Sequence, residues 1–306
     1  MELLNQKQAS TLFNLPPATL STKIKKYKIH ADGGTPGRPL YKKETLLKYF
    51  SLQEIESSDS VIISICNQKG GEMKTTLTQY LGQALAIKGK KVLLVDMDPQ
   101  ASLTSYFCNY PDKSLADLMG LTAVKANFSD VVVKISENIN LLPSNIKLSA
   151  FSQIVKIKDY KRLFNVLNPV RSEYNFIILD CGPFLGPLLD NALTAADKVL
   201  IPVQCREYSC LGLDLLSDSI NDIKEDLNPR LEILGAVLAF YDQREIMSEK
   251  KDEIGEFFTV LKTPIYKRAS IPQNQATKED YFKKHPKDAA MFLKLADEIL
   301  QILEME

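Results

Sequence analysis

Apolar and polar positions follow a regular order from about residue 60 to the end of the chain. Short apolar runs bounded by polar residues or glycine predict buried strands, and stretches with apolar residues at helical spacing predict helices. The predicted strands are Val61–Cys66, Val92–Asp96, Phe176–Asp180, Val199–Val203 and Leu231–Phe240. The predicted helices are Thr75–Lys88, Asp159–Leu167, Leu188–Ala195, Gly212–Asp226 and Glu249–Phe258. This alternation predicts an α/β fold, with a mostly parallel sheet and helices on both faces.

The final stretch, Asp288–Glu306, also carries apolar residues at helical spacing, which predicts a helix that packs on the core. Helices that bind anionic membranes carry Lys and Arg on their polar face, whereas this one carries acidic residues. No apolar run approaches the ~18 residues of a membrane span, and the N-terminal residues lack the apolar part of a signal peptide. We therefore expect a cytoplasmic protein that does not bind membranes.

Charge is distributed unevenly along the chain, although the net charge is zero over 306 residues. Between Lys7 and Lys48 there are nine Lys and Arg residues against two acidic ones, a surplus of seven, so the remainder carries minus seven. A basic segment joined to an acidic body is typical of proteins that bind the phosphates of nucleic acids. The basic segment is therefore a candidate DNA-binding region.

The pattern within the basic segment predicts two short helices joined by a turn. Gln6–Phe13 and Ala18–Tyr27 can form the helices, with Leu15-Pro16-Pro17 between them. The glycine- and proline-rich residues 33–39 can form a wing, and Lys43–Phe50 can form a third helix. This order resembles the winged helix-turn-helix of the MerR and excisionase type. The polar stretch Ser51–Ser60 predicts a linker or the end of a connecting helix, so we expect a DNA-binding domain over 1–57 and a second domain over 58–306.

The resemblance to winged helix-turn-helix proteins implies that the second helix enters the major groove and that an arginine of the wing contacts DNA. The residues that it places against DNA are Thr19, Ser21, Thr22, Lys25, Lys26 and Arg38. The alternative is a basic helical cap that packs on the second domain or mediates dimerisation without contacting DNA.

The loop after the first predicted strand of the second domain contains Lys69-Gly70-Gly71-Glu72-Met73-Lys74-Thr75-Thr76. A strand that runs through glycines into a helix presents free backbone N–H groups at the positive end of the helix dipole, where phosphate is favoured. Lys74 adds a full positive charge, and the Thr75 hydroxyl can bind Mg²⁺. The phosphate-loop pattern G-x-x-x-x-G-K-[ST] would require glycine at Gln68 and Met73, so only its Lys-Thr end is present.

Asp96 and Asp180 each end a predicted strand. Ligands of open α/β sheets bind beyond the carboxyl ends of the strands, so both carboxylates are expected beside the loop. Either aspartate could instead cap a helix, and Lys74 could instead be a solvated lysine in the first turn of its helix.

Together these motifs resemble the ParA/MinD-type ATPases, whose deviant Walker A sequence is K-G-G-x-x-K-[ST]. The loop fits that sequence, Asp96-x-Asp98-Pro99-Gln100 fits the second motif of the family, and Phe176–Asp180 fits its Walker B strand. The resemblance covers roughly residues 60–306 and implies a deviant P-loop NTPase that binds ATP and Mg²⁺. By the same resemblance the nucleotide would be held by the loop residues 69–76.

The resemblance also implies individual roles. Lys74 would bind the β- and γ-phosphates, and Lys69 would reach across a dimer to the partner's nucleotide. Thr75 would bind Mg²⁺ directly and Asp180 through water. Asp96, next to the metal, would orient or activate the attacking water. The candidate catalytic residues are thus Lys69, Lys74 and Asp96, and the candidate metal residues are Thr75, Asp96 and Asp180.

Glu72 and Met73 depart from the family, which has a small apolar residue followed by glycine at these positions. A Cβ atom at the second position limits how closely the backbone approaches phosphate. A carboxylate at the first would repel phosphate unless a cation lies between them. We therefore expect weak or slow ATP hydrolysis.

The function implied by the resemblance is DNA partition by a nucleoid-associated homodimer, which closes on ATP, coats DNA and is stimulated by a ParB-type partner. The winged segment would also make the protein an autorepressor of its operon. Lys267 and Arg268 match part of a basic patch with which partition members bind DNA, the alternative being a solvated charge run. Two other functions remain open: a nucleotide-sensing transcriptional regulator with little hydrolysis, and an ATPase that positions a non-DNA cargo.

Overall fold

A computed structural model describes most of the chain, which divides into two compact units, Met1–Ser58 and Asp59–Glu306. The described residues are 3–12, 20–21, 24–25, 29–35, 38–42, 60–109, 111–153, 157–204, 212–241 and 247–304.

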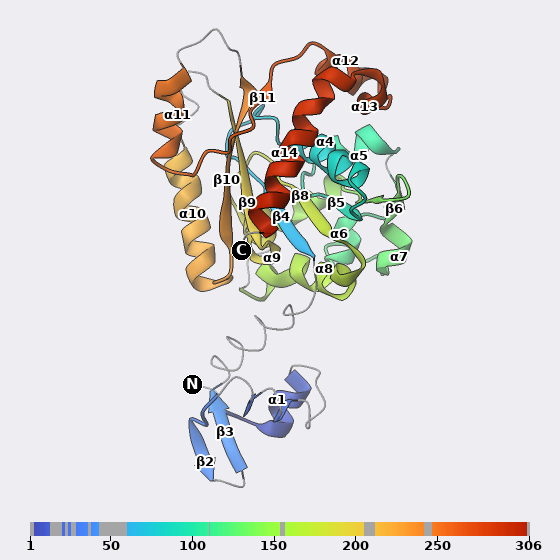
Figure 1. Ribbon diagram of the computed structural model, residues 1–306. Coiled ribbons are helices and arrows are strands. Elements are labelled where there is room, and N and C mark those ends of the chain that lie inside the picture. Colours follow the sequence, from blue (N-terminus) through green and yellow to red (C-terminus); the bar gives the residue numbers. More distant parts are fainter. Residues whose placement is uncertain are drawn as a thin grey trace. The chain divides into compact units, whose positions relative to one another are not determined.

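The first unit contains a small antiparallel sheet and a short helix (Figure 1). Its elements are β1 (Leu3–Asn5), α1 (Gln6–Leu12), β2 (Gly33–Thr35) and β3 (Arg38–Lys42), with the sheet order β1-β3-β2. α1 starts with a reciprocal pair of bonds, because Gln8 N donates to Asn5 Oδ1 and Asn5 N donates to Gln8 Oε1, both at 2.9 Å.

Among its described residues, six buried side chains form the core of this unit: Leu4, Ala9, Leu20, Ile24, Ile29 and Tyr41. The first predicted helix is present as α1, and the described residues of the second, 20–21 and 24–25, are helical. β2 and β3 pair as a hairpin where the sequence predicts the wing. The predicted helix 43–50 and almost all of the predicted linker lie outside the described residues.

The second unit is built on an eight-stranded sheet with the order β11-β10-β9-β4-β8-β5-β7-β6. All neighbouring strands are parallel except β6 and β7. The strands are β4 (Val61–Ile65), β5 (Val92–Asp96), β6 (Val133–Lys134), β7 (Ile139–Leu142), β8 (Phe176–Asp180), β9 (Lys198–Gln204), β10 (Glu232–Tyr241) and β11 (Ile265–Tyr266). The five predicted strands are all present, and the prediction of a mostly parallel sheet is confirmed.

Helices cover both faces of this sheet (Figure 1). They are α4 (Lys74–Ile87), α5 (Ser102–Phe107), α6 (Leu115–Leu118), α7 (Phe128–Val131), α8 (Arg162–Leu167), α9 (Pro187–Ala195), α10 (Leu213–Asp226), α11 (Met247–Gly255), α12 (Ser270–Thr277), α13 (Tyr281–Lys284) and α14 (Pro286–Glu304). Three 3₁₀ segments span Ile146–Gln153, Ile157–Lys161 and Asn168–Glu173. The helix predicted over Asp159–Leu167 is therefore a 3₁₀ turn followed by α8.

Alternate residues of the central strands belong to two separate hydrophobic clusters. In β4, Ile62 packs in the cluster that contains residues of α9 and α10, whereas Ile63 packs in the cluster of α4 and α14. This is the period of two expected of a sheet buried on both faces. α14 contributes Phe292 and Leu295, both fully buried, which confirms that this helix packs on the core. Among the described residues no helix is both long and apolar enough to traverse a bilayer.

Candidate functional site

The three central strands β4, β8 and β5 bring the predicted loop and the two predicted aspartates to one edge of the sheet. Asp96 and Asp180 are paired directly opposite each other in the β5–β8 register. The loop follows β4, the other neighbour of β8, and leads into α4. The Lys74 ammonium lies close enough to Asp180 for the carboxylate to influence its pKa. The fold therefore assembles Lys74, Asp96 and Asp180, as the sequence predicts.

Two residues of the loop have left-handed backbone angles. Gly71 has a φ of 80°, and Met73, which immediately precedes α4, has a φ of 63°. Glycine adopts this region without cost, whereas another residue held there carries about 1–3 kcal/mol of strain. The Met73 side chain is buried in the cluster that contains α4 residues such as Leu77, so it packs in the core and not at the loop surface.

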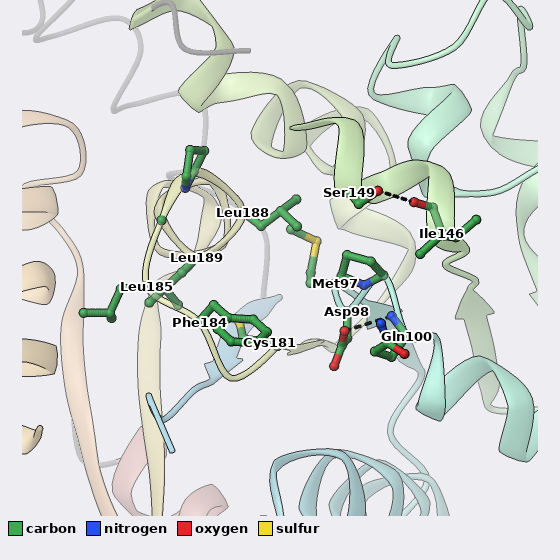
Figure 2. A pocket seen from close by; sticks show the side chains of 14 residues that line it. Met97, Asp98, Gln100, Ile146, Ser149, Cys181, Phe184, Leu185, Leu188 and Leu189 are labelled. Carbon is green, nitrogen blue, oxygen red and sulfur yellow. Dashed lines mark hydrogen bonds between the residues drawn. The ribbon is translucent and has the colours of Figure 1, made fainter. Parts of the chain in front are cut away.

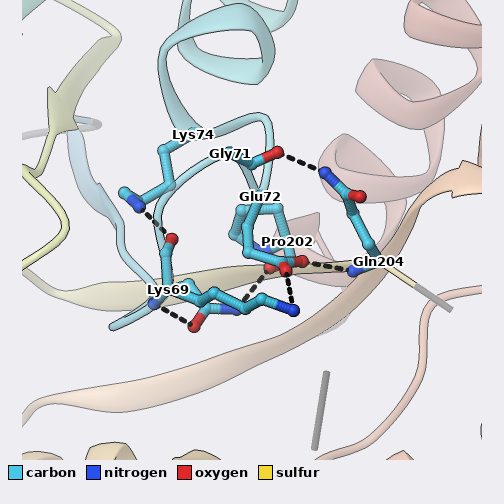
Figure 3. Close-up of polar contacts among 7 residues, drawn as sticks. Lys69, Gly71, Glu72, Lys74, Pro202 and Gln204 are labelled. Atoms are coloured by element: carbon cyan, nitrogen blue, oxygen red, sulfur yellow. Dashed lines mark hydrogen bonds and ion pairs between the residues drawn. The ribbon is translucent and has the colours of Figure 1, made fainter. Parts of the chain in front are cut away.

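Glu72 connects the loop to the end of β9 (Figure 3). Its carboxylate is 1% exposed, accepts the backbone N–H of Gln204 at 2.5 Å, and lies 3.6 Å from Lys69 Nζ. The Gln204 side chain in turn donates to the Gly71 carbonyl oxygen. Burial raises the pKa of Glu72, while the Gln204 N–H and Lys69 act in the opposite direction. The carboxylate is therefore not isolated in the loop, because it has two partners within the protein.

Lys74 is the first residue of α4, and its side chain folds back over the loop. Its Nζ donates to the Lys69 carbonyl oxygen at 2.8 Å (Figure 3), and the residue is only 7% exposed. Burial lowers the pKa of Lys74, and the nearby Asp180 carboxylate opposes this shift. The alternative of a solvated first-turn lysine is therefore wrong. Thr75 and Thr76 follow it in the first turn of α4, both half-buried, whereas Gly70 and Gly71 are exposed.

Asp96 has partners for both carboxylate oxygens. Oδ2 accepts from the backbone N–H and the hydroxyl of Thr104, at 2.8 and 2.7 Å, and Oδ1 accepts from Asp98 N at 3.1 Å. Because Thr104 lies in the first turn of α5, Asp96 binds the N-terminus of that helix, as the helix-cap alternative expects. Burial raises the pKa of Asp96 to about 6.

Within the part of the chain that the structure describes, one carboxylate oxygen of Asp180 has no hydrogen-bond partner. Oδ1 accepts weakly from the Thr78 hydroxyl at 3.4 Å, whereas the buried Oδ2 finds no hydrogen-bond partner among the described residues. Burial and the neighbouring Asp96 carboxylate raise the pKa of Asp180, and a hydrogen bond from Thr75 opposes them. A buried carboxylate oxygen without a partner, beside a threonine hydroxyl, fits a hard divalent cation such as Mg²⁺.

Several residues that organise this site were not predicted. Thr104 holds Asp96, and Asn67 joins the loop to β9 by donating from Nδ2 to the Pro202 carbonyl oxygen at 2.7 Å. Asn67 Oδ1 also accepts the Lys69 N–H at 3.2 Å. Isolated threonine and asparagine residues carry no periodic signal, and the only hint for Thr104 is its place at the start of a helix that the sequence did not predict.

An apolar cavity of about 340 Å³ lies next to the aspartates, between the segments that follow β5 and β8 (Figure 2). It is lined by Asp98, Cys181 and Leu188, among others, and Phe184 at its edge is 79% exposed. Asp98 Oδ1 accepts the Gln100 N–H at 2.9 Å, so this side chain stabilises its own loop.

The candidate DNA contacts are distributed over both units. In the first, Lys25 and Arg38 are exposed and Ser21 is half-buried, whereas Thr19, Thr22 and Lys26 lie outside the described residues. In the second, Lys267 and Arg268 directly follow β11 and are exposed. Arg268 Nε lies 3.1 Å from Asp288 Oδ1, and its guanidinium lies 5.3 Å from the centre of the Tyr266 ring. Part of the Arg268 charge is therefore already compensated.

Comparison with known proteins identifies the family. A family model described as an AAA domain matches residues 60–233, more than half of the chain. Soj, the sporulation initiation inhibitor protein of Bacillus subtilis, is 34% identical over 258 residues, covering 78% of this chain and 97% of Soj. The chromosome partitioning protein ParA of Caulobacter vibrioides is 36% identical over 196 residues, covering 62% of this chain and 73% of ParA. The chain belongs to the ParA/MinD-type P-loop ATPases.

A solved structure supports the same fold for this ParA/MinD-type chain. Cobyrinic acid a,c-diamide synthase from Mycobacterium smegmatis, with bound ADP and magnesium, superposes with a TM-score of 0.69 at 29% identity. The match covers 80% of this chain and 96% of that one. The predicted P-loop fold is thus confirmed. Glu72 and Met73, the two positions at which we expect a departure from the family's loop, are both buried in this structure.

Proposed function

We propose that this chain is an ATP-dependent DNA partition protein of the ParA type that acts as a homodimer. The observation that carries the nucleotide-binding part of the proposal is the Asp180 oxygen that has no hydrogen-bond partner within the described residues, beside Thr75 and Lys74 at the carboxyl end of the central strands. Family membership, the name of the Caulobacter relative and the magnesium nucleotide of the Mycobacterium synthase support it. ATP with Mg²⁺ is the ligand that we propose for this site.

In the proposed site the chain's own residues hold and orient the nucleotide. Lys74 and the backbone N–H groups of the loop would bind phosphate oxygens, and Lys69 would reach across the dimer to the nucleotide of a partner subunit. Thr75 and Asp180 would hold Mg²⁺, which when bound supplies positive charge for the phosphates. Asp96 is held by Thr104 and Asp98, so it would orient water from a fixed position.

We further propose that turnover is weak. Met73 places a Cβ at the strained position before Lys74, and Glu72 removes positive potential from the loop. The test is ATP hydrolysis measured with and without duplex DNA over a range of protein concentrations. We expect slow turnover that rises with concentration, as a dimer requires, and rises further with DNA. Calorimetry that detects no ATP uptake with Mg²⁺ would overturn the proposal.

DNA binding is proposed at two places, the winged segment for an operator or centromere-like site and the Lys267 region for DNA of any sequence. A ParB-type protein bound to the same DNA is the proposed stimulating partner, and operator binding would make the protein an autorepressor.

Changing Lys267 and Arg268 together to alanine should weaken nonspecific DNA binding in the presence of ATP. Removing one lysine–phosphate interaction reduces the log–log salt slope by about 0.9. Because Arg268 is already paired with Asp288, we expect Lys267→Ala to account for most of the loss of affinity. Fluorescence anisotropy of labelled duplex DNA at several salt concentrations measures the slope. Lys125→Ala, an exposed lysine of the same unit, is the control, and an equal effect in that variant contradicts the prediction.

A nucleotide-sensing transcriptional regulator is the second candidate, and the strained Met73 and buried Glu72 favour it. ATP that alters operator binding without measurable turnover would support this function. Absence of any DNA binding by the full chain would instead favour an ATPase for a non-DNA cargo.

A further inference from the structure

Lys69 already forms an ion pair within its own subunit. Its side chain is 44% exposed, and its ammonium lies 3.6 Å from the Glu72 carboxylate, which is 1% exposed (Figure 3). The glutamate is the fixed member of this pair, because the Gln204 backbone holds its carboxylate from the end of β9. The lysine is the movable member, since an exposed side chain of four methylenes can take many positions.

Gln204 restrains the loop around Glu72 at two points. The Gln204 N–H binds the Glu72 carboxylate, and the Gln204 side chain binds the neighbouring Gly71 carbonyl. Glu72 cannot follow Lys69 outward without breaking its bond to β9. When Lys69 leaves, the buried carboxylate loses its ion-pair partner and keeps only the weaker influence of Lys74, and removing one member of a buried ion pair is unfavourable.

We propose that Glu72 is a positioning residue that retains Lys69 on its own subunit, so that Lys69 must leave this ion pair before it can serve a partner subunit's nucleotide. The inference rests on the proposed function for the role of Lys69 in a dimer, but the ion pair lies within a single subunit and can be measured separately. Glu72 would thereby oppose closure of the ATP dimer. A small apolar residue, the usual one at this position in the family, cannot hold a lysine in this way.

The first test measures Lys69 in the nucleotide-free protein. The protein is treated with a low concentration of an acylating reagent, and mass spectrometry measures the rate at which Lys69 is acylated. Lys125 is the internal control. The ion pair holds the ammonium against the Glu72 carboxylate and limits the access of the reagent to it, so Glu72→Gln should speed acylation of Lys69 about fivefold and leave Lys125 unchanged. Glutamine keeps an oxygen that can accept the Gln204 N–H. Equal Lys69 rates in both proteins would overturn the proposal.

The same labelling in the wild type provides a measurement that does not depend on folding of the variant. Raising the ionic strength from about 0.05 M to about 1 M screens a partly exposed ion pair. We expect the acylation rate of Lys69 to increase relative to that of Lys125. A constant ratio would count against the ion pair and against the proposal.

The second test is a double-mutant cycle on dimerisation with Mg²⁺ and a non-hydrolysable ATP analogue. Sedimentation gives the dimer Kd for wild type, Glu72→Gln, Lys69→Ala and the double variant. We expect Glu72→Gln to tighten the dimer several-fold when Lys69 is present and to have no effect when it is alanine. An equal gain in both backgrounds would mean that Glu72 acts by repelling phosphate, and would overturn the proposal. Absence of nucleotide binding in every protein would overturn the proposed function instead, and the labelling result would still decide whether Glu72 retains Lys69.

Discussion

Replacing Lys74 with alanine is expected to reduce ATP hydrolysis by about 10²- to 10³-fold, the effect typical of removing one preorganised group that stabilises transition-state charge. Lys74 is 7% exposed and oriented toward the loop by its bond to the Lys69 carbonyl oxygen, so the protein itself fixes its position. The rate of phosphate release at saturating ATP measures the effect, and calorimetry measures the accompanying loss of affinity.

Lys125→Ala is the matched control, because it removes one exposed lysine from the same unit. Its rate should equal that of the wild type. Circular dichroism should show Lys74→Ala to be folded, since burial already disfavours the charged form of this lysine. A folded Lys74→Ala protein with at least half of the wild-type rate would contradict the assignment of this residue.

Asp180→Asn is expected to abolish Mg²⁺-dependent hydrolysis and, at the same time, to stabilise the nucleotide-free protein by about 1–2 kcal/mol at pH 7. Asp180 is fully buried opposite Asp96, and one of its oxygens has no partner among the described residues. Burial and the second carboxylate raise its pKa, so the ionised form destabilises the fold. Asparagine keeps the shape and removes the charge.

The pH dependence of the stabilisation by Asp180→Asn follows from the direction in which the pKa of Asp180 is shifted. An aspartate whose folded pKa is raised binds its proton more tightly in the folded state, so its destabilising effect appears only above the unfolded value of about 3.9. It then grows until the pH exceeds the folded pKa. Urea unfolding at about pH 3.5 and 7 should therefore show a stabilised Asp180→Asn at the higher pH only.

The control for Asp180→Asn is Asp117→Asn, which weakens the capping box at the start of α6. We expect the free energy of unfolding of that variant to fall by about 1 kcal/mol. The opposite signs then separate the effect of the Asp180 site from the effect of replacing any aspartate by asparagine. An Asp180→Asn protein that is less stable than the wild type at pH 7 would show that the carboxylate is not destabilising.

The central strands could be predicted because they are buried on both faces and therefore appear as continuous apolar runs. The edge strands could not, since β6 and β11 contain two residues each, too few for any period to be visible. The same holds for α6 and α7, which contain four residues each, about one helical turn. Their positions are fixed by tertiary contacts.

The grouping of the candidate site residues could be predicted where they are contiguous in the sequence or end a strand, as do Lys69–Thr76, Asp96 and Asp180. The partners of these residues could not, because they lie far away in sequence. Glu72 and Gln204 are separated by 132 residues, and nothing in either segment indicates that one holds the other. From the sequence, the Glu72 carboxylate was expected to lie near phosphate. In the structure it accepts the Gln204 N–H and lies beside the Lys69 ammonium.

The backbone angle of Met73 has a consequence for how this loop can change. Glycine there would relieve about 1–3 kcal/mol of strain, but it would also delete a buried side chain whose removal costs about 2–5 kcal/mol. At the middle of both ranges, the single exchange toward the common family sequence is a net loss of stability of about 1–2 kcal/mol. A route back needs a second substitution that refills the space beneath α4, so the unusual loop persists once the core has adapted to it.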